Sequence, residues 1–241
     1  MPVYERKNLQ TYNQKLLKGA VIIMAVDLKD KKIILTIGRE FGSGGRKIGS
    51  LISAKLGIPF YDKDLLNRAA EESGIDAETF DKMDEKRYTS LLFSFVRKLE
   101  KSGSKPEHDD TGILSMNERL YLIQKQIIKN IAKEGSCIIM GRCSNITLKK
   151  DPDAVHIFIK ANHDFKVQNL NKLKKLEKNA AEKLIKDTDK ERAAYFKYYT
   201  GGLKWGQSEN YNYIIDSSVL GLEGTADLIC DMVLKKLNIH N

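Results

Sequence analysis

A run of small residues, Gly42-Ser43-Gly44-Gly45, lies between a short apolar run at residues 33–37 and a segment with helical periodicity. The apolar run predicts a buried strand, and the helical spacing of apolar residues continues to Gly57. A glycine-rich turn between a strand and a helix lets successive backbone N–H groups point at a phosphate, and the helix N-terminus adds its positive dipole end. The sequence therefore predicts a site for nucleotide phosphates at residues 42–47, with a tight turn that binds nothing as the alternative.

The glycine loop departs from the standard phosphate-binding motif, GxxxxGK[ST]. In one register Gly45 stands at the lysine position, and a shift by one residue places Arg46 there and Lys47 at the hydroxyl position. Arg46 can neutralise phosphate charge, although its planar guanidinium is not equivalent to an ammonium. No Ser or Thr follows the loop to bind Mg²⁺, so the metal ligands cannot be assigned from the sequence.

Short apolar runs alternate with helical segments along most of the chain, which is typical of an α/β protein with a parallel sheet. The pattern predicts a final amphipathic helix over residues 222–237 and strands at residues 33–37, 58–61, 137–140, 155–159 and 213–215. We therefore expect a three-layer core of the P-loop NTPase type with a five-stranded parallel sheet. The connections after the second and fourth strands are too long for simple crossovers and indicate inserted sub-domains.

The chain is basic, with a formal charge of +9 and a pI near 9.2. Such a charge favours anionic partners without choosing among them. Many lysines lie within residues 166–190, which predict one long polar helix with a solvated face. No aromatic residue interleaves with these lysines, so a stacking platform for single strands is not indicated, and nucleic acid is not an expected partner. A basic nucleic-acid-binding protein stays open as an interpretation that rests on the pI alone.

The three cysteines, Cys137, Cys143 and Cys230, form no CxxC pair. Cys137 and Cys230 sit in apolar runs and are expected to be buried thiols. Sparse cysteines suit a reducing cytosol, and the apolar run at residues 20–26 is too short to span a membrane. These features predict a cytoplasmic protein with no membrane partner. Residues 1–30 are read as an N-terminal extension with no assigned role.

Five segments occur in a consistent order: GREFGSGGRKIG at 38–49, LGIPFYDKDLLNRAA at 56–70, IIMGRCSNI at 138–146, DPDAVHIFIKA at 151–161 and DKERAAYF at 189–196. With these segments the chain resembles the cytidylate kinase-like family, relatives of bacterial cytidylate kinase among the P-loop nucleoside monophosphate kinases. The resemblance runs from about residue 33 to the C-terminus. It implies a kinase-like domain over residues 31–241, with a helical monophosphate-binding insertion at 63–133 and a lid at about 187–207.

The resemblance also implies roles for individual residues. Asp62 and Arg68 match a segment whose arginine holds the acceptor monophosphate, and Arg142 matches an arginine beside the acceptor nucleotide. Asp189 and Arg192 match a lid element that brings charge to the acceptor and the transferring phosphates. Phosphoryl transfer depends on alignment and positive charge rather than on covalent help from the protein. The candidate catalytic residues are therefore Arg46, Arg142 and Arg192.

ATP and Mg²⁺ are the cofactors that the resemblance implies. The implied reaction transfers the γ-phosphoryl group of ATP to a nucleoside monophosphate, with CMP or dCMP as the first guess, or to another small acceptor. Two positions depart from the family pattern: Met140 stands where its kinases have an aspartate, and Ile185 where a further lid arginine is expected. The missing lysine and aspartate keep another interpretation open, a nucleotide-binding protein of kinase ancestry that regulates without turnover.

Overall fold

The computed structural model describes residues 31–62 and 116–239. Its middle layer is a parallel sheet with the strand order β2-β3-β1-β4-β5. The strands are β1 (Ile34–Arg39), β2 (Phe60–Tyr61), β3 (Cys137–Met140), β4 (Ala154–Lys160) and β5 (Tyr213–Asp216). The predicted three-layer α/β fold with a five-stranded parallel sheet is confirmed.

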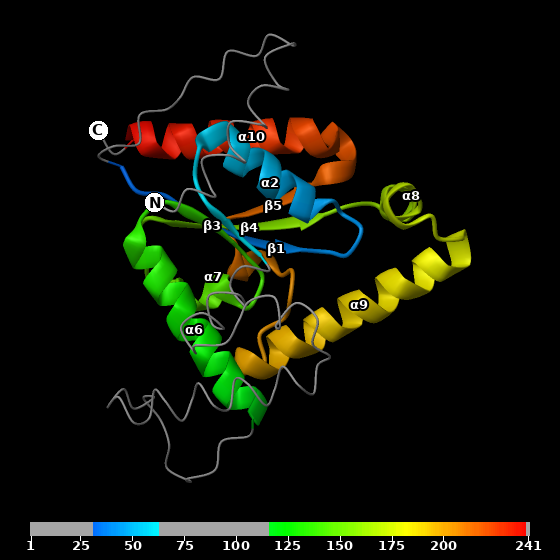
Figure 1. The fold of residues 1–241 in the computed structure, drawn as a ribbon, viewed down its shortest axis with the longest axis horizontal. Helices are drawn as coiled ribbons and strands as arrows, with labels where there is room; N and C mark the ends of the chain where they lie inside the picture. The colour runs from blue at the N-terminus through cyan, green and yellow to red at the C-terminus, as the bar shows by residue number, and fades with distance from the viewer. Residues whose placement is uncertain (1–30, 63–115, 240–241) are drawn as a thin grey trace, which may run out of the picture.

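Helices cover both faces of this sheet (Figure 1). One face carries α2 (Gly45–Leu56) and α10 (Ser217–Ile239), and the other carries α6 (Met116–Glu134) and the short α7 (Ser144–Thr147). Because both faces are covered, the strands are mostly apolar and do not alternate with polar residues, although Thr36 and His156 are polar exceptions inside the sheet. In β1, Leu35 and Ile37 join the core beneath α2 and α10, whereas Ile34 joins the core against α6.

Helix α2 ends where the sequence predicts. Gly57 adopts the left-handed conformation with φ 68°, and its N–H donates to the carbonyl of Ser53 at 2.9 Å. Glycine takes this conformation without steric cost, so it stops the helix and turns the chain toward β2. The helix buries Ile48, Ile52 and Leu56 on one face. Its N-terminal end follows β1 directly, which places the glycine loop at the carboxyl edge of the sheet.

The prediction of one long polar helix over residues 166–190 was wrong. The structure has two helices there, α8 (His163–Lys174) and α9 (Lys178–Tyr199), because Lys175 adopts a left-handed backbone with φ 52°. The break lets the two helices fold against each other. They share a small buried cluster, and its members are Val167, Leu170, Ala181 and Ile185. A charged lid arginine at position 185 would have to enter this apolar cluster, which accounts for the isoleucine there.

Helix α10 begins earlier than predicted and contains non-helical backbone at Gly221, with φ 68° and ψ −175°, just before the predicted start. All three cysteines are free and buried, as expected for Cys137 and Cys230. Of the expected helical insertion, the part over residues 63–115 lies outside the described residues, and α6 forms its end. Within the described ranges, no helix combines the length and the apolar character needed to cross a membrane.

A polar pair is buried inside the sheet. Thr36 on β1 lies opposite His156 on β4, and the Thr36 Oγ1 and His156 Nδ1 atoms are 2.8 Å apart. Burial, with the nearby positive charges of Lys236 and Lys149, lowers the pKa of His156 from 6.5 to about 4, while Asp151 acts in the opposite direction. The imidazole is therefore neutral near pH 7.

The lowered pKa of His156 predicts a pH-dependent loss of stability. Between pH 6.5 and about 4 the unfolded chain binds a proton at this histidine that the folded chain does not, so the free energy of unfolding falls as the pH falls through that window. The loss attributable to His156 is on the order of 3 kcal/mol. Urea denaturation at pH 7 and pH 4.5 measures it.

The variant His156→Gln keeps a hydrogen-bonding partner for Thr36 but does not titrate, so it should lose less stability between the two pH values than the wild type. His163→Gln is the matched control, because the His163 side chain is 57% exposed and pairs with Glu182 at the surface. Equal pH dependence in His156→Gln and the wild type would contradict a buried neutral histidine.

Candidate functional site

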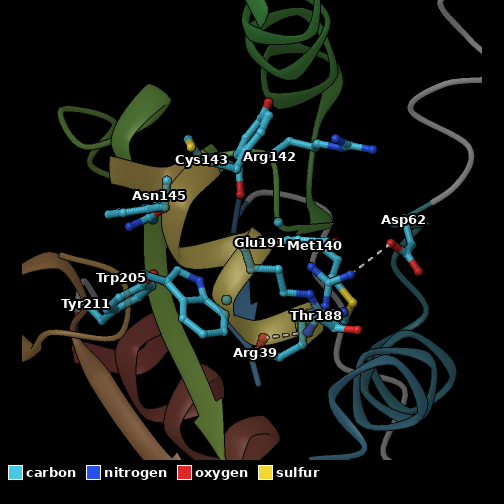
Figure 2. A pocket seen from close by; sticks show the side chains of 16 residues that line it. Arg39, Asp62, Met140, Arg142, Cys143, Asn145, Thr188, Glu191, Trp205 and Tyr211 are labelled. Carbon is cyan, nitrogen blue, oxygen red and sulfur yellow. Dashed lines mark hydrogen bonds and ion pairs between the residues drawn. The ribbon is translucent and has the colours of Figure 1, made fainter. Parts of the chain in front are cut away.

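A cavity of about 480 Å³ lies at the carboxyl ends of β1 and β3, beneath α9 (Figure 2). Ligands of open α/β sheets bind at this edge, near the strands where the chain changes direction. Here β1 and β3 are neighbours, and the chain leaves them over opposite faces of the sheet, through α2 after β1 and α7 after β3. The residues that line the cavity are Gly38, Arg39, Asp62, Met140, Gly141, Arg142, Cys143, Ser144, Asn145, Thr188, Glu191, Arg192, Tyr195, Phe196, Trp205 and Tyr211.

Three elements bring arginines to this cavity. Arg39 is the last residue of β1. Arg142 follows β3 in a turn whose N–H at Gly141 donates to the carbonyl of Ile37 at 3.0 Å, and Gly141 and Arg142 both have positive φ, 75° and 55°. Arg192 comes from α9, and its Nη1 donates to the carbonyl of Arg39 at 3.0 Å. The strand ends and the helix are thus tied together at the cavity wall.

The cavity carries concentrated positive charge. Burial and then the charge of Arg192 lower the pKa of Arg39 to about 10, Asp62 raises it, and Arg142 and Arg46 lower it further. Burial also lowers the pKa of Arg192. Arg39 nevertheless stays protonated near pH 7. Clustered buried guanidinium groups favour an anion, and they pair well with the oxygens of a phosphate.

Asp62 links the cavity to the start of α2. Its carboxylate is 3.6 Å from Arg39 Nη2 and 3.1 Å from Arg46 Nε. The Arg46 side chain is 63% exposed and does not line the cavity, and Lys47 is exposed as well. Of the sequence-predicted residues, the structure therefore brings Asp62, Arg142 and Arg192 together. Arg68 lies outside the described residues.

The glycine loop adjoins the cavity without lining it. Gly42 and Gly44 have left-handed backbones with φ 82° and 78°, which places glycine where other residues are strained. The first helical hydrogen bond of α2 runs from the N–H of Ile48 to the carbonyl of Gly44, so the N–H groups of residues 45–47 precede the helical ladder. Such N–H groups at a helix N-terminus suit a phosphate, and a donor site at residues 42–47 stays a prediction.

An ionic cluster fastens the glycine loop to the helices beyond it. Lys166 Nζ on α8 is 2.7 Å from a carboxylate oxygen of Glu40 and 3.5 Å from one of Asp189. Asp189 also accepts the N–H of Phe41 at 2.6 Å, and Glu40 accepts the N–H of Ala161 at 3.1 Å. Asp189 therefore faces the loop and not the cavity. Burial raises its pKa, whereas the Phe41 N–H and the charge of Lys166 oppose the rise.

The sequence analysis did not single out Arg39, although the structure places its charge at the centre of the site. The predicted strand ended at residue 37, two residues before β1 ends. The rule that ligands bind at strand carboxyl ends, applied to the true end of β1, would have selected it. Trp205 and Tyr211 form an aromatic wall of the cavity, and of these two residues Tyr211 was also missed, because no motif marks it in the sequence.

The described residues do not offer a ligand set for Mg²⁺. Met140 is buried at the end of β3, where a carboxylate would be needed. The hydroxyl of Ser43 donates to the carbonyl of Glu40 at 2.9 Å. Residues 31–62 and 116–239 hold no group of three or more His, Cys, Asp or Glu side chains that could bind a metal. Residues 31–62 and 116–239 would thus give a magnesium ion few ligands, and the phosphates of a nucleotide could supply others.

A parallel sheet with a glycine loop between β1 and α2, and a cationic cavity at the strand ends, defines a P-loop α/β protein of the kinase type. The chain belongs to the cytidylate kinase-like family, whose model matches residues 34–219. A search of curated proteins finds no match.

Several solved structures are similar to this chain, and one of them has a TM-score above 0.5. An uncharacterized protein from Eubacterium ventriosum matches with a TM-score of 0.57 and 22% identity, over 84% of this chain and 98% of that one. Shikimate kinase from Bacteroides thetaiotaomicron matches with a TM-score of 0.46 and 13% identity, over 83% and 98%. Shikimate kinase from Acinetobacter baumannii, in complex with shikimate, matches with a TM-score of 0.46 and 14% identity, over 87% of this chain and 96% of that one. At these identities the likeness concerns the fold alone.

The ionic cluster around Lys166 predicts a large stability effect. Lys166→Met leaves the carboxylates of Glu40 and Asp189 near each other without their shared cation, so the free energy of unfolding should fall by roughly 2–3 kcal/mol. Lys55→Met is the matched control, because it breaks a more exposed pair with Asp227 at 2.8 Å and should cost less than about 1 kcal/mol. Urea denaturation compares the two variants, and equal small losses would show that the cluster does not hold the loop.

Proposed function

We propose that this protein transfers the γ-phosphoryl group of ATP to a nucleoside monophosphate, with CMP and dCMP as the first acceptors to test. Membership of the cytidylate kinase-like family supports the general class. One observation supports the kind of acceptor: the cavity joins a cationic end to an aromatic end. A phosphate and a base attached to it would each find a suitable surface there.

The two ends of the cavity lie on opposite sides in Figure 2, with Trp205 and Tyr211 facing the region of Arg39 and Asp62. The aromatic wall is firmly packed. Phe158 contacts the ring of Trp205 edge-on at 5.1 Å between centroids and that of Tyr211 at 5.0 Å. Aromatic rings stack on nucleobases, and guanidinium groups bind phosphate through paired N–H donors. The volume of about 480 Å³ is in the range of small-molecule sites.

In the proposed reaction a phosphate oxygen of the acceptor attacks the γ-phosphorus of ATP, the bond from that phosphorus to the β–γ bridging oxygen breaks, and ADP leaves. Arg142 and Arg192 would hold the acceptor phosphate, with Arg68 and Asp62 completing that site. Residues 42–47, including the cationic side chains of Arg46 and Lys47, would hold the donor phosphates. Asp189 would hold α9, the proposed lid helix, against the glycine loop. This division of roles supplies alignment and charge, which is what phosphoryl transfer requires.

A regulatory protein that binds nucleotide without turnover is the second candidate. Met140 at the end of β3 and Gly45 at the lysine position favour it, because both remove groups that an active P-loop kinase ordinarily uses. Tight nucleotide binding without ADP formation across a broad set of acceptors would distinguish this candidate from an enzyme. The cytoplasmic location expected from the sparse cysteines suits either function.

The test is ADP release from Mg-ATP against a panel of nucleoside monophosphates, with a reaction lacking acceptor as the baseline. We expect turnover that depends on the acceptor. Arg142→Ala should lower kcat/KM by about 100-fold, since it removes a positive charge proposed to hold the acceptor phosphate.

Lys150→Ala is the matched control for Arg142→Ala. Lys150 is an exposed cation after α7 that does not line the cavity, so its loss removes the same charge without touching the site. Full activity in Arg142→Ala would rule out its proposed role. Absence of turnover in the wild type, together with nucleotide binding by calorimetry, would replace the enzyme with the regulatory candidate.

A further inference from the structure

The side chain of Arg39 passes between two glycines at the edge of the sheet. A Cβ atom built on Gly45 would lie 2.7 Å from Arg39 Cβ, and one built on Gly141 would lie 2.5 Å from Arg39 Nη1. Separations this short are not compatible with a side chain at either position while Arg39 keeps its place. The aliphatic part of Arg39 thus rests against Gly45, and its guanidinium rests against Gly141.

The glycine at position 45 is not required by its own backbone. Gly42, Gly44 and Gly141 have positive φ, but Gly45 is not among such residues and opens helix α2. Any residue could adopt that helical backbone, and glycine costs about 1 kcal/mol relative to alanine in a helix interior. What does exclude a side chain from position 45 is contact with Arg39. The glycine therefore makes room for the arginine.

The standard motif explains why these two positions belong together. When GxxxxGK[ST] is laid on the loop with its second glycine on Gly44, its first glycine falls on Arg39 and its lysine on Gly45. The chain thus has a cation where the motif has glycine, and glycine where the motif has a cation. Because positions 39 and 45 are in contact, a lysine at 45 and an arginine at 39 exclude each other. The site thus keeps one positive charge, which is attached at position 39 and not at position 45.

The guanidinium of Arg39 lies where donor and acceptor phosphates would meet. It lines the cavity beside Arg142 and Arg192, and its backbone is six residues before the start of α2, where its stem lies against Gly45. Its side chain is 22% exposed, so it remains open to a ligand. The Asp62 carboxylate is 3.6 Å from Arg39 Nη2, and a phosphate oxygen could bind the guanidinium at a shorter distance.

We propose that Arg39 performs the phosphate-binding role of the lysine in a standard P-loop, and that Gly45 is glycine to leave space for it. This inference rests on the proposed function, since it takes the loop to be a site for nucleotide phosphates. An arginine in this role offers paired N–H donors in a fixed plane, so it can bridge oxygens of two phosphates that a lysine would contact as a point charge.

The test is an exchange of the two residues, read by calorimetric titration with Mg-ATP and, separately, by ADP release. The set comprises the wild type, Arg39→Gln, Gly45→Lys and the double variant Arg39→Gly with Gly45→Lys. We expect Arg39→Gln to weaken ATP binding by about 30-fold, because it removes the charge while keeping most of the volume. The Gly45→Lys variant should bind Mg-ATP weakly, because the new lysine side chain overlaps with Arg39. The dissociation constant of the double variant for Mg-ATP should return to within about fivefold of the wild-type value.

Thermal denaturation of every variant separates lost binding from lost folding, and Arg39→Gln is included because it leaves neither a cavity nor an overlap. Lys55→Gln, at the far end of α2, controls for loss of one positive charge. ATP binding within threefold of wild type in Arg39→Gln, or no recovery in a folded double variant, would overturn the inference. A wild type that does not bind ATP would instead overturn the proposed function on which it rests.

Discussion

The burial of Arg39 is the constraint on which the site depends. A guanidinium taken out of water must be compensated, and the structure compensates it with the shared carboxylate of Asp62 while Arg192 and Arg142 stand close by. The positive charge that remains can be satisfied by an anion. Gly45 leaves space for the stem of this side chain and Gly141 for its guanidinium, and Arg192 donates a hydrogen bond to the Arg39 carbonyl.

The glycine loop and α9 are coupled by a second ionic group, whose members do not line the cavity. Lys166, Glu40 and Asp189 join α8, the loop and α9, so that a displacement of α9 must disturb the backbone at Phe41. Arg192 lies one turn beyond Asp189 on the same helix and reaches the cavity. A change in the position of α9 would therefore affect both the glycine loop and the cavity wall.

The fold could be predicted from the sequence because its signals are local. The run at residues 137–140 is β3, and Gly57 stops α2 as glycine does elsewhere. The break at Lys175 could not be predicted, because no glycine or proline marks it. The apolar residues that pack together once the helix is broken are far apart in the sequence. The placing of Arg39 in the site was missed for a similar reason, because its contacts with Gly141 and Asp62 are made across strands.

Nucleotide phosphates are proposed to lie along the line from the start of α2 to the cavity. A crystal structure with a compound that joins adenosine and cytidine through a chain of five phosphates tests this claim most directly. The phosphates should run from the N–H groups of residues 45–47 past Arg39 to Arg142 and Arg192, with the cytosine against Trp205. Phosphates bound away from Arg39, or no complex at saturating concentrations of the compound, would contradict the claim.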